Sequence, residues 1–253
     1  MDQRDGPRDL HPILWLGLPV GSLALVWLTP LLGYARWKAF MLGEFGFIET
    51  ATVAFLIPPI ILGVLVFLKR RRLPGGVGWL MLLMAAAALY FAGEEASWGQ
   101  HWLGFRTPES LADANRQEEF NLHNIYGLGI LNEFPRLVMT LACIGAAVLP
   151  LVLHRRLTRP EARRGLWYWL IPTWRLVPIA AISVCSTLPE KFVKKVLDLD
   201  LPQDHYAYMA LVARAGEFKE YCFAIVIFLY ALSVFCRQRR WRAPAAPPAV
   251  SGG

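Results

Sequence analysis

The sequence predicts an all-α polytopic protein, with about six transmembrane helices and both chain ends on the same side of the membrane. Hydrophobic residues make up 56% of the 253 residues and charged residues only 18%, below the roughly 25% typical of a soluble domain. Long apolar runs alternate with short charged clusters, and several runs reach or approach the roughly 20 residues that cross a bilayer. The runs lack the alternating pattern of barrel strands, so the expected spanning element is the helix.

The apolar runs place the six spans along the chain. We expect them at 12–34, 46–68, 77–93, 136–153, 167–188 and 219–236. The first run is too long for a cleaved signal peptide and lacks its small-residue cleavage pattern, so it should stay in the membrane. Residues 1–240 are expected to form one transmembrane domain. The Pro/Ala/Gly-rich tail, residues 241–253, is expected to be disordered.

Lysine and arginine predict the orientation of the spans. The segments LKRRRLPGG, HRRLTRPEARRG and CRQRRWR, together with the N-terminus, hold more than half of the 26 basic residues. With six spans these segments share one side, which the positive-inside rule assigns to the cytoplasm of a bacterial inner membrane. Both termini should then be cytoplasmic, and a structured helical loop between spans 3 and 4 should lie on the outer side.

The positive net charge follows from this topology. The formal charge is +7, yet no basic stripe with interleaved aromatic residues occurs, so no nucleic-acid partner is expected. Membrane lipids are the expected partners, together with a protein partner or a second copy of the chain in the membrane.

Most of the 19 acidic residues and most of the histidines fall on the predicted outer side. A charge at membrane depth is costly unless it is paired or neutralised, so such a residue usually has a function. The candidate residues on this side are Glu49, Glu94, Glu95, Ser97, His101, Glu118, Glu119, His123, His205 and Glu217.

The stretch GEEASWGQHWLGF, residues 93–105, follows directly on the third apolar run. If it continues as a helix, Glu94, Ser97 and His101 share one narrow face. Glu94 and His101 would lie two turns apart, too far to bond directly, but both could reach a ligand or metal between them. Thr107 is the expected N-cap of a following helix, with Pro108 at its first position.

The candidate residues include side chains of the kinds that commonly bind metals. His101, His123 and His205, together with Glu94 or Glu95, could bind zinc or another divalent metal. Such a metal would activate water beside the bilayer, with Ser97 or a neutral glutamate assisting proton transfer. The alternative is structural, because interfacial glutamates and histidines often only cap helices or bond to loops. No compact motif of the HExxH type decides between the two.

Arg175 is unusual because it lies between Pro172 and Pro178 in the fifth apolar run. A buried arginine needs a carboxylate, and Glu49 and Glu217 are the candidates. Alternatively, the fifth span begins near Arg175, and the guanidinium reaches back to the cytoplasmic interface.

One string of motifs resembles a known family. Gly93-Glu94-Glu95-x-Ser97-Trp98-Gly99-Gln100 is followed by Thr107-Pro108-Glu109 and Asn121-Leu122-His123-Asn124. This GEExSWGQ, TPE and NLHN pattern resembles a family of uncharacterised bacterial polytopic membrane proteins. The resemblance implies a shared element on the outer face and implies no particular activity.

A looser likeness concerns Ser97-x-x-x-His101 followed by Asp113. This spacing is similar to the first half of the pattern in alkaline ceramidases, which are seven-span, zinc-dependent intramembrane hydrolases. The second half of that pattern is a closely spaced histidine pair on a late span. Here the last span offers Glu217 and Glu220 instead.

Two function hypotheses follow. The first is a metal-dependent hydrolase or transferase acting on a lipid or lipid-linked substrate, which requires the outer glutamates and histidines to converge. The second is a non-enzymatic membrane component: a carrier, an assembly factor or an accessory subunit. It predicts that Glu94 and Glu95 are satisfied by Arg106, Arg136 or backbone amides.

Overall fold

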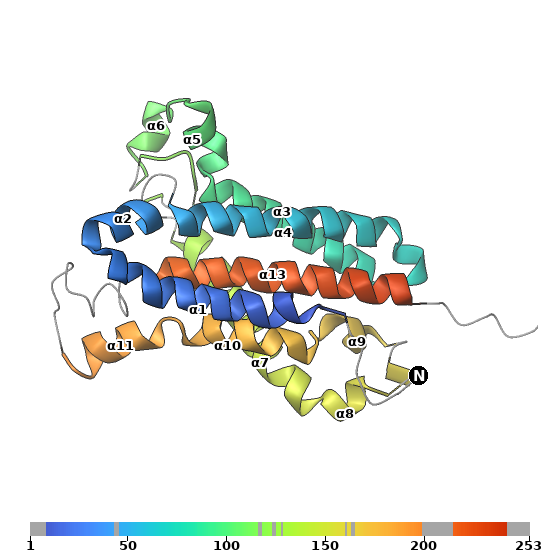
Figure 1. Ribbon diagram of the computed structural model, residues 1–253. Helices are drawn as coiled ribbons and strands as arrows, with labels where there is room; N and C mark the ends of the chain where they lie inside the picture. The colour runs from blue at the N-terminus through green and yellow to red at the C-terminus, as the bar shows by residue number, and fades with distance from the viewer. Residues whose placement is uncertain are drawn as a thin grey trace, which may run out of the picture.

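A computed structural model shows a bundle of helices (Figure 1). It describes residues 9–42, 46–115, 118–122, 125–127, 129–159, 161–162, 165–198 and 215–241. Within these ranges there is no strand, and one isolated bridge joins Asn115 to Ile125. Six helical segments are long and apolar enough to cross a membrane. The predicted all-α polytopic fold is confirmed, and the chain is a multi-pass membrane protein.

The six spans follow the predicted order. They are Ile13–Leu32 (η1 Ile13–Gly17, α1 Leu18–Leu28, η2 Thr29–Leu32), α3 Phe47–Leu68, α4 Val77–Glu95, α7 Ile130–Val152, Leu166–Lys195 (α9 Leu166–Leu170, η6 Trp174–Leu176, α10 Val177–Cys185, α11 Leu188–Lys195) and α13 Ala215–Arg240. Short helices connect them: α2 Tyr34–Leu42, η3 Arg70–Arg72, η4 Ser97–Gly99, α5 Gln100–Leu103, α6 Glu109–Ala112 and α8 His154–Leu157. Span 4 begins earlier than predicted, because the helix runs on through the polar residues Asn132 to Arg136.

The last span, α13, is the central helix of the bundle. Of its most apolar window, 61% is buried, against 17% for α7. It runs between the α3–α4 pair and α10 (Figure 1), and it packs most extensively against α3. Its inward residues include Phe223, Ile225 and Leu229. A helix that is apolar on nearly all sides is stable only in such a surrounded position.

Helices α3 and α4 approach closely at Gly63. A Cβ atom built on Gly63 would lie 2.5 Å from the carbonyl oxygen of Met81 and 2.8 Å from the Cβ of Ala85. Helix α4 presents further small residues, Ala88 and Ala92, as buried positions. Small residues at a helix contact allow the backbones to approach, which is a common packing mode of membrane helices.

Replacing Gly63 with alanine should therefore destabilise the bundle by about 1–3 kcal/mol, because the nearest obstacle is backbone and cannot move aside alone. The free energy of unfolding in mixed micelles measures this effect. Gly21→Ala is the matched control, since Gly21 lies within α1 and a Cβ atom added there would have no neighbour within 4 Å. Equal losses in the two variants would contradict the tight α3–α4 contact.

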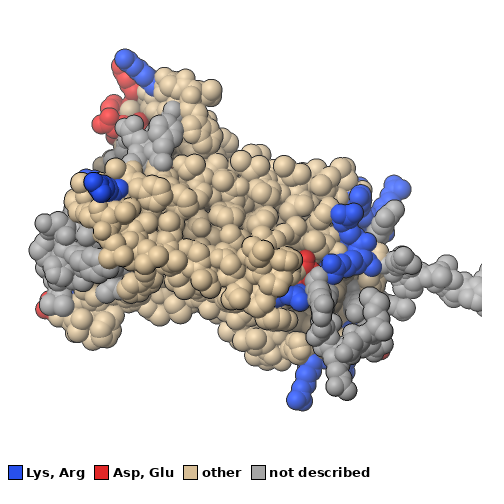
Figure 2. Space-filling view, viewed as in Figure 1, with Lys and Arg blue, Asp and Glu red and all other residues tan. Residues whose placement is uncertain are grey.

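The bundle has two unlike ends. Lysine and arginine side chains gather where α3 and α13 finish (Figure 2), which we call the basic end. The opposite end carries α5 and α6 (Figure 1), and we call it the loop end. The first described residues also lie at the basic end, because Asp9 contacts Ser233 near the end of α13. Cytoplasmic placement of this end stays a prediction.

Candidate functional site

The chain changes direction just after α4. Helix α4 ends at Glu95, and the backbone then takes left-handed values at Ser97 (φ 43°), Trp98 (φ 51°) and Gly99 (φ 88°). The prediction of one continuous helical face for Glu94, Ser97 and His101 is therefore wrong. Left-handed backbone is unfavourable for residues with side chains, so it persists only where tertiary contacts compensate.

Glu94 provides the first of these contacts. Its side chain is buried, with the residue only 4% exposed. Oε1 accepts a hydrogen bond from the indole Nε1 of Trp98 at 2.8 Å, and Oε2 accepts one from the backbone N–H of Leu122 at 2.8 Å. The carboxylate therefore joins the end of α4 to two points of the loop that follows it.

A second set of hydrogen bonds joins Ser97 to the far part of the loop. The Ser97 hydroxyl donates to Oε2 of Glu119 at 2.9 Å. The side-chain amide of Asn121 donates to the same oxygen at 2.8 Å. Asn115 in turn donates to the backbone oxygen of Asn121 at 2.9 Å and to its side-chain oxygen at 2.8 Å.

Gln100 forms a third set of hydrogen bonds between parts of this loop. Its Oε1 accepts a hydrogen bond from the backbone N–H of Phe120 at 2.7 Å, and its Nε2 donates to the Thr107 hydroxyl at 2.8 Å. Thr107 is therefore not the N-cap of α6; Pro108 occupies that position, with no side-chain hydrogen bond. We call the whole network the loop clasp: Glu94, Ser97, Trp98, Gln100, Thr107, Asn115, Glu119 and Asn121.

Glu95 is not part of the loop clasp. It lies within electrostatic range of Glu49, Glu220 and Arg136. Arg136 on α7 forms an ion pair with Glu220, with 2.6 Å between Nε and Oε1. Glu49 occupies the first turn of α3, and Glu217 the first turn of α13. The loop end therefore gathers carboxylates from three helices, α3, α4 and α13, with Arg136 among them.

The structure describes only some of the residues predicted to bind a metal. The backbone of His101 lies in α5, and nothing is described of its side chain; His123 and His205 lie outside the described residues. Glu118 is exposed and has a left-handed backbone (φ 58°). Within the described part of the chain, no group of three His, Cys, Asp or Glu side chains could hold a metal ion. Zinc binding by the three histidines stays a prediction.

At the basic end, the fifth span is broken. Helix α9 ends at Leu170, and the backbone is extended at Ile171 (ψ 124°) and Thr173 (ψ 158°) before η6 begins. Pro172 causes the break, because a proline disfavours helical backbone in the residue before it and has no N–H to donate.

Side chains of α13 satisfy carbonyl groups near this break. The Tyr230 hydroxyl donates to the carbonyl oxygen of Trp169 at 2.9 Å. Nη1 of Arg237 donates to the carbonyl oxygen of Tyr168 at 2.6 Å. The interrupted span is therefore held by its central neighbour, as buried irregular backbone in a membrane protein requires.

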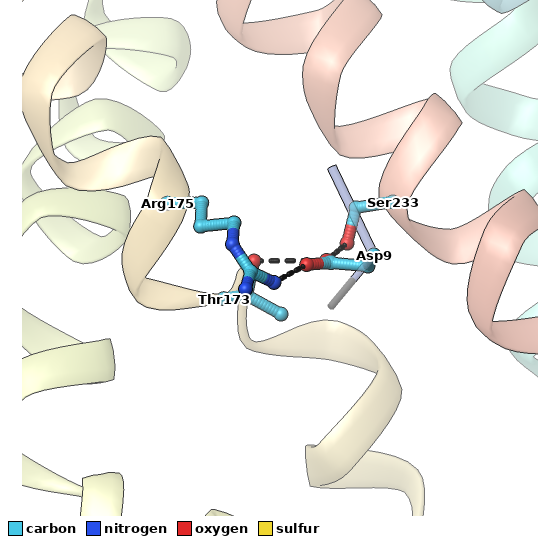
Figure 3. Close-up of polar contacts among 4 residues, drawn as sticks. All are labelled: Asp9, Thr173, Arg175 and Ser233. Atoms are coloured by element: carbon cyan, nitrogen blue, oxygen red, sulfur yellow. Dashed lines mark hydrogen bonds and ion pairs between the residues drawn. The ribbon is translucent and has the colours of Figure 1, made fainter. Parts of the chain in front are cut away.

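Arg175 forms a buried ion pair beside the break (Figure 3). Its Nη1 lies 2.5 Å from Oδ1 of Asp9; Asp9 is 5% exposed and Arg175 9% exposed. The other carboxylate oxygen accepts hydrogen bonds from the hydroxyls of Thr173, at 2.9 Å, and Ser233. Three segments, the N-terminal stretch, the fifth span and α13, thus meet at one carboxylate.

Both sequence-based interpretations of Arg175 are corrected by this pair. The guanidinium does not reach the surface, and its observed carboxylate is Asp9 rather than one of the two expected candidates. Glu49 and Glu217 start helices at the loop end, whereas Arg175 lies at the basic end. The available signal was the position of Asp9, an acidic residue directly before the first apolar run.

Comparison of the chain with protein-family models, with curated proteins and with solved structures gave no match.

Proposed function

We propose that this protein is a non-enzymatic component of a bacterial inner-membrane assembly, acting as an accessory subunit or assembly factor. The part it presents to a partner protein is the outer-face module, residues 93–127. In this proposal the termini are cytoplasmic and the loop end faces outward, as the distribution of lysine and arginine predicts.

The observation that carries the proposal is the bonding of Glu94. Both carboxylate oxygens accept hydrogen bonds from the loop itself, one from Trp98 and one from the Leu122 amide. Each of these bonds uses one of the two lone pairs on its oxygen to hold the loop, and Glu94 is only 4% exposed, so its carboxylate faces the loop rather than solvent. The non-enzymatic hypothesis predicts a hydrogen bond from a backbone amide to Glu94, and the Leu122 amide forms such a bond.

The surface of the module supports the same proposal. Trp102, Leu103 and Tyr126 are large apolar or aromatic side chains that are exposed on it. Large exposed apolar side chains of this kind are available for contact with a partner protein. The loop clasp holds the chain that carries them, so less conformational entropy is lost when a partner binds.

Photocrosslinking in native membranes tests the proposal. Benzoylphenylalanine placed at Leu103, which is 77% exposed on the module, should give one discrete crosslinked protein adduct. The matched control is the same group at Leu83, a 67% exposed position on α4 that should meet lipid only. The Leu103 adduct should weaken when Glu94→Gln loosens the module. No adduct at Leu103, or the same adduct at both positions, would contradict the proposal.

The alternative function is a hydrolase or transferase acting on a lipid or lipid-linked substrate. One contact favours it: the Ser97 hydroxyl lies 2.9 Å from Glu119 Oε2, the arrangement by which a carboxylate activates a hydroxyl nucleophile. In this alternative His101, His123 and His205 bind zinc or a similar metal. Near-stoichiometric metal in the purified protein, lost in His101→Ala or His123→Ala, would favour the enzyme. Background metal in all three proteins would favour the accessory role.

A further inference from the structure

A groove opens at the basic end, where α7 and α8 face the break in the fifth span. The groove is open at one side, and its empty volume, including the solvent at its mouth, is about 430 Å³. Pro150, Leu157 and Trp174 contribute apolar walls. His154 of α8 and Thr158, the C-cap residue of α8, add polar groups. The groove is therefore amphipathic, with apolar surface along most of its walls and polar groups at one side.

Arg237 also lines this groove and brings a buried positive charge to it. The residue is 4% exposed, and its Cζ lies 5.2 Å from the ring centroid of Tyr168 and 5.5 Å from that of Trp169. Its terminal nitrogens donate to the carbonyl oxygens of these two residues, at 2.6 and 3.5 Å. Its Nε has no hydrogen-bond partner among the described residues.

The charge of Arg237 is not balanced by a carboxylate in the described part of the chain. The ion pairs there join other residues. Asp9 approaches the groove through Thr173, but its charge is already paired with Arg175. A buried guanidinium with an unused donor, and with no carboxylate partner among the described residues, favours an anion with oxygen acceptors.

The position of the groove indicates which anion. It lies where α7 ends and the fifth span begins, at the level of the helix ends, close to the exposed residues Arg155 and Arg156. In a bilayer this is the depth of the phospholipid headgroups, and basic pockets between spans are known to bind anionic headgroups.

We propose that this groove binds one anionic phospholipid. The headgroup phosphate pairs with Arg237, His154 and Thr158 contact the polar headgroup, and an acyl chain lies against Pro150, Leu157 and Trp174. The proposal concerns the basic end alone and does not depend on the function of the loop end.

Native mass spectrometry of the detergent-solubilised full chain tests this site, with added phosphatidylglycerol and, for comparison, phosphatidylcholine of the same acyl chains. Wild type should retain one phosphatidylglycerol in preference to phosphatidylcholine. Arg237→Gln should weaken retention at least about fivefold, as loss of one interfacial cation implies. Thr158→Trp, which fills the groove from an exposed position, should weaken it similarly without disturbing the contacts of Arg237. Arg239→Gln removes an exposed charge from the same helix end and should have little effect.

Three results would overturn the proposal. Equal weakening by Arg237→Gln and Arg239→Gln, with wild-type retention in Thr158→Trp, would indicate diffuse electrostatic attraction. Equal retention of phosphatidylcholine would show that the headgroup charge is not recognised. Full displacement of phosphatidylglycerol by inorganic phosphate would show that the groove takes free phosphate rather than a lipid.

Discussion

Replacing Asp9 with alanine should destabilise the folded protein by about 3–5 kcal/mol, because it leaves a buried guanidinium without its partner. Arg175 is 9% exposed, so water cannot replace the lost carboxylate. The hydroxyls of Thr173 and Ser233 lose their acceptor in the same step. The free energy of unfolding in mixed micelles is the measurement.

Two comparisons make this result specific to the buried pair. Glu190→Ala removes the partner of Lys194, an exposed ion pair of 2.8 Å, and should cost only about 0.3–0.5 kcal/mol. The double variant Asp9→Ala with Arg175→Met should recover most of the lost stability, because it removes both charges together. The expectation fails if Asp9→Ala costs no more than Glu190→Ala, or if the double variant is less stable than the single one.

Replacing Glu94 with alanine is expected to cost about 2–4 kcal/mol, since two hydrogen bonds to a buried carboxylate are lost and their donors are left unsatisfied. The loss should be local, because Glu94 holds the loop rather than the bundle core. Hydrogen exchange of the peptide that contains Leu122 should become much faster, and the loop should become sensitive to protease after Arg106.

Glu118→Ala is the matched control for this loss, because Glu118 is an exposed glutamate of the same loop. It should leave the Leu122 amide as protected as in the wild type. Glu94→Gln, which keeps one acceptor oxygen, should give an intermediate exchange rate. Unchanged protection in Glu94→Ala would show that Glu94 does not hold the loop, and would remove the main support for the accessory role.

The helical fold and the six spans could be predicted from local composition. The run from Val77 to Ala92 has no charged residue, so it favours lipid over water. In lipid its backbone N–H and C=O groups form hydrogen bonds within a helix, so this secondary structure depends little on the rest of the chain. The break in the fifth span was also signalled locally, because Pro172 restricts its own backbone and that of Ile171. These features depend on residues that are adjacent in sequence.

The candidate sites were predicted less well. Residue type singled out Glu94 and Ser97, and the side chains of both form hydrogen bonds of the loop clasp; a functional role for either residue stays a prediction. The prediction of a continuous helix through His101 was wrong. Helical periodicity shows which residues share a face, but it does not show where contacts with another part of the chain end the helix. Asn115 and Asn121 were missed, since short polar side chains in a loop are common and indicate no particular partner.

By itself, the sequence determined that this chain forms six apolar helices with unlike ends, because hydrophobicity and helix formation act over neighbouring residues. Only the tertiary structure decided which polar groups meet. Asp9 and Arg175 are 166 positions apart, and Glu94 and the Leu122 amide are 28 apart. Such pairs form only where packing brings them together and removes water, so their partners cannot be identified from residue type or spacing alone.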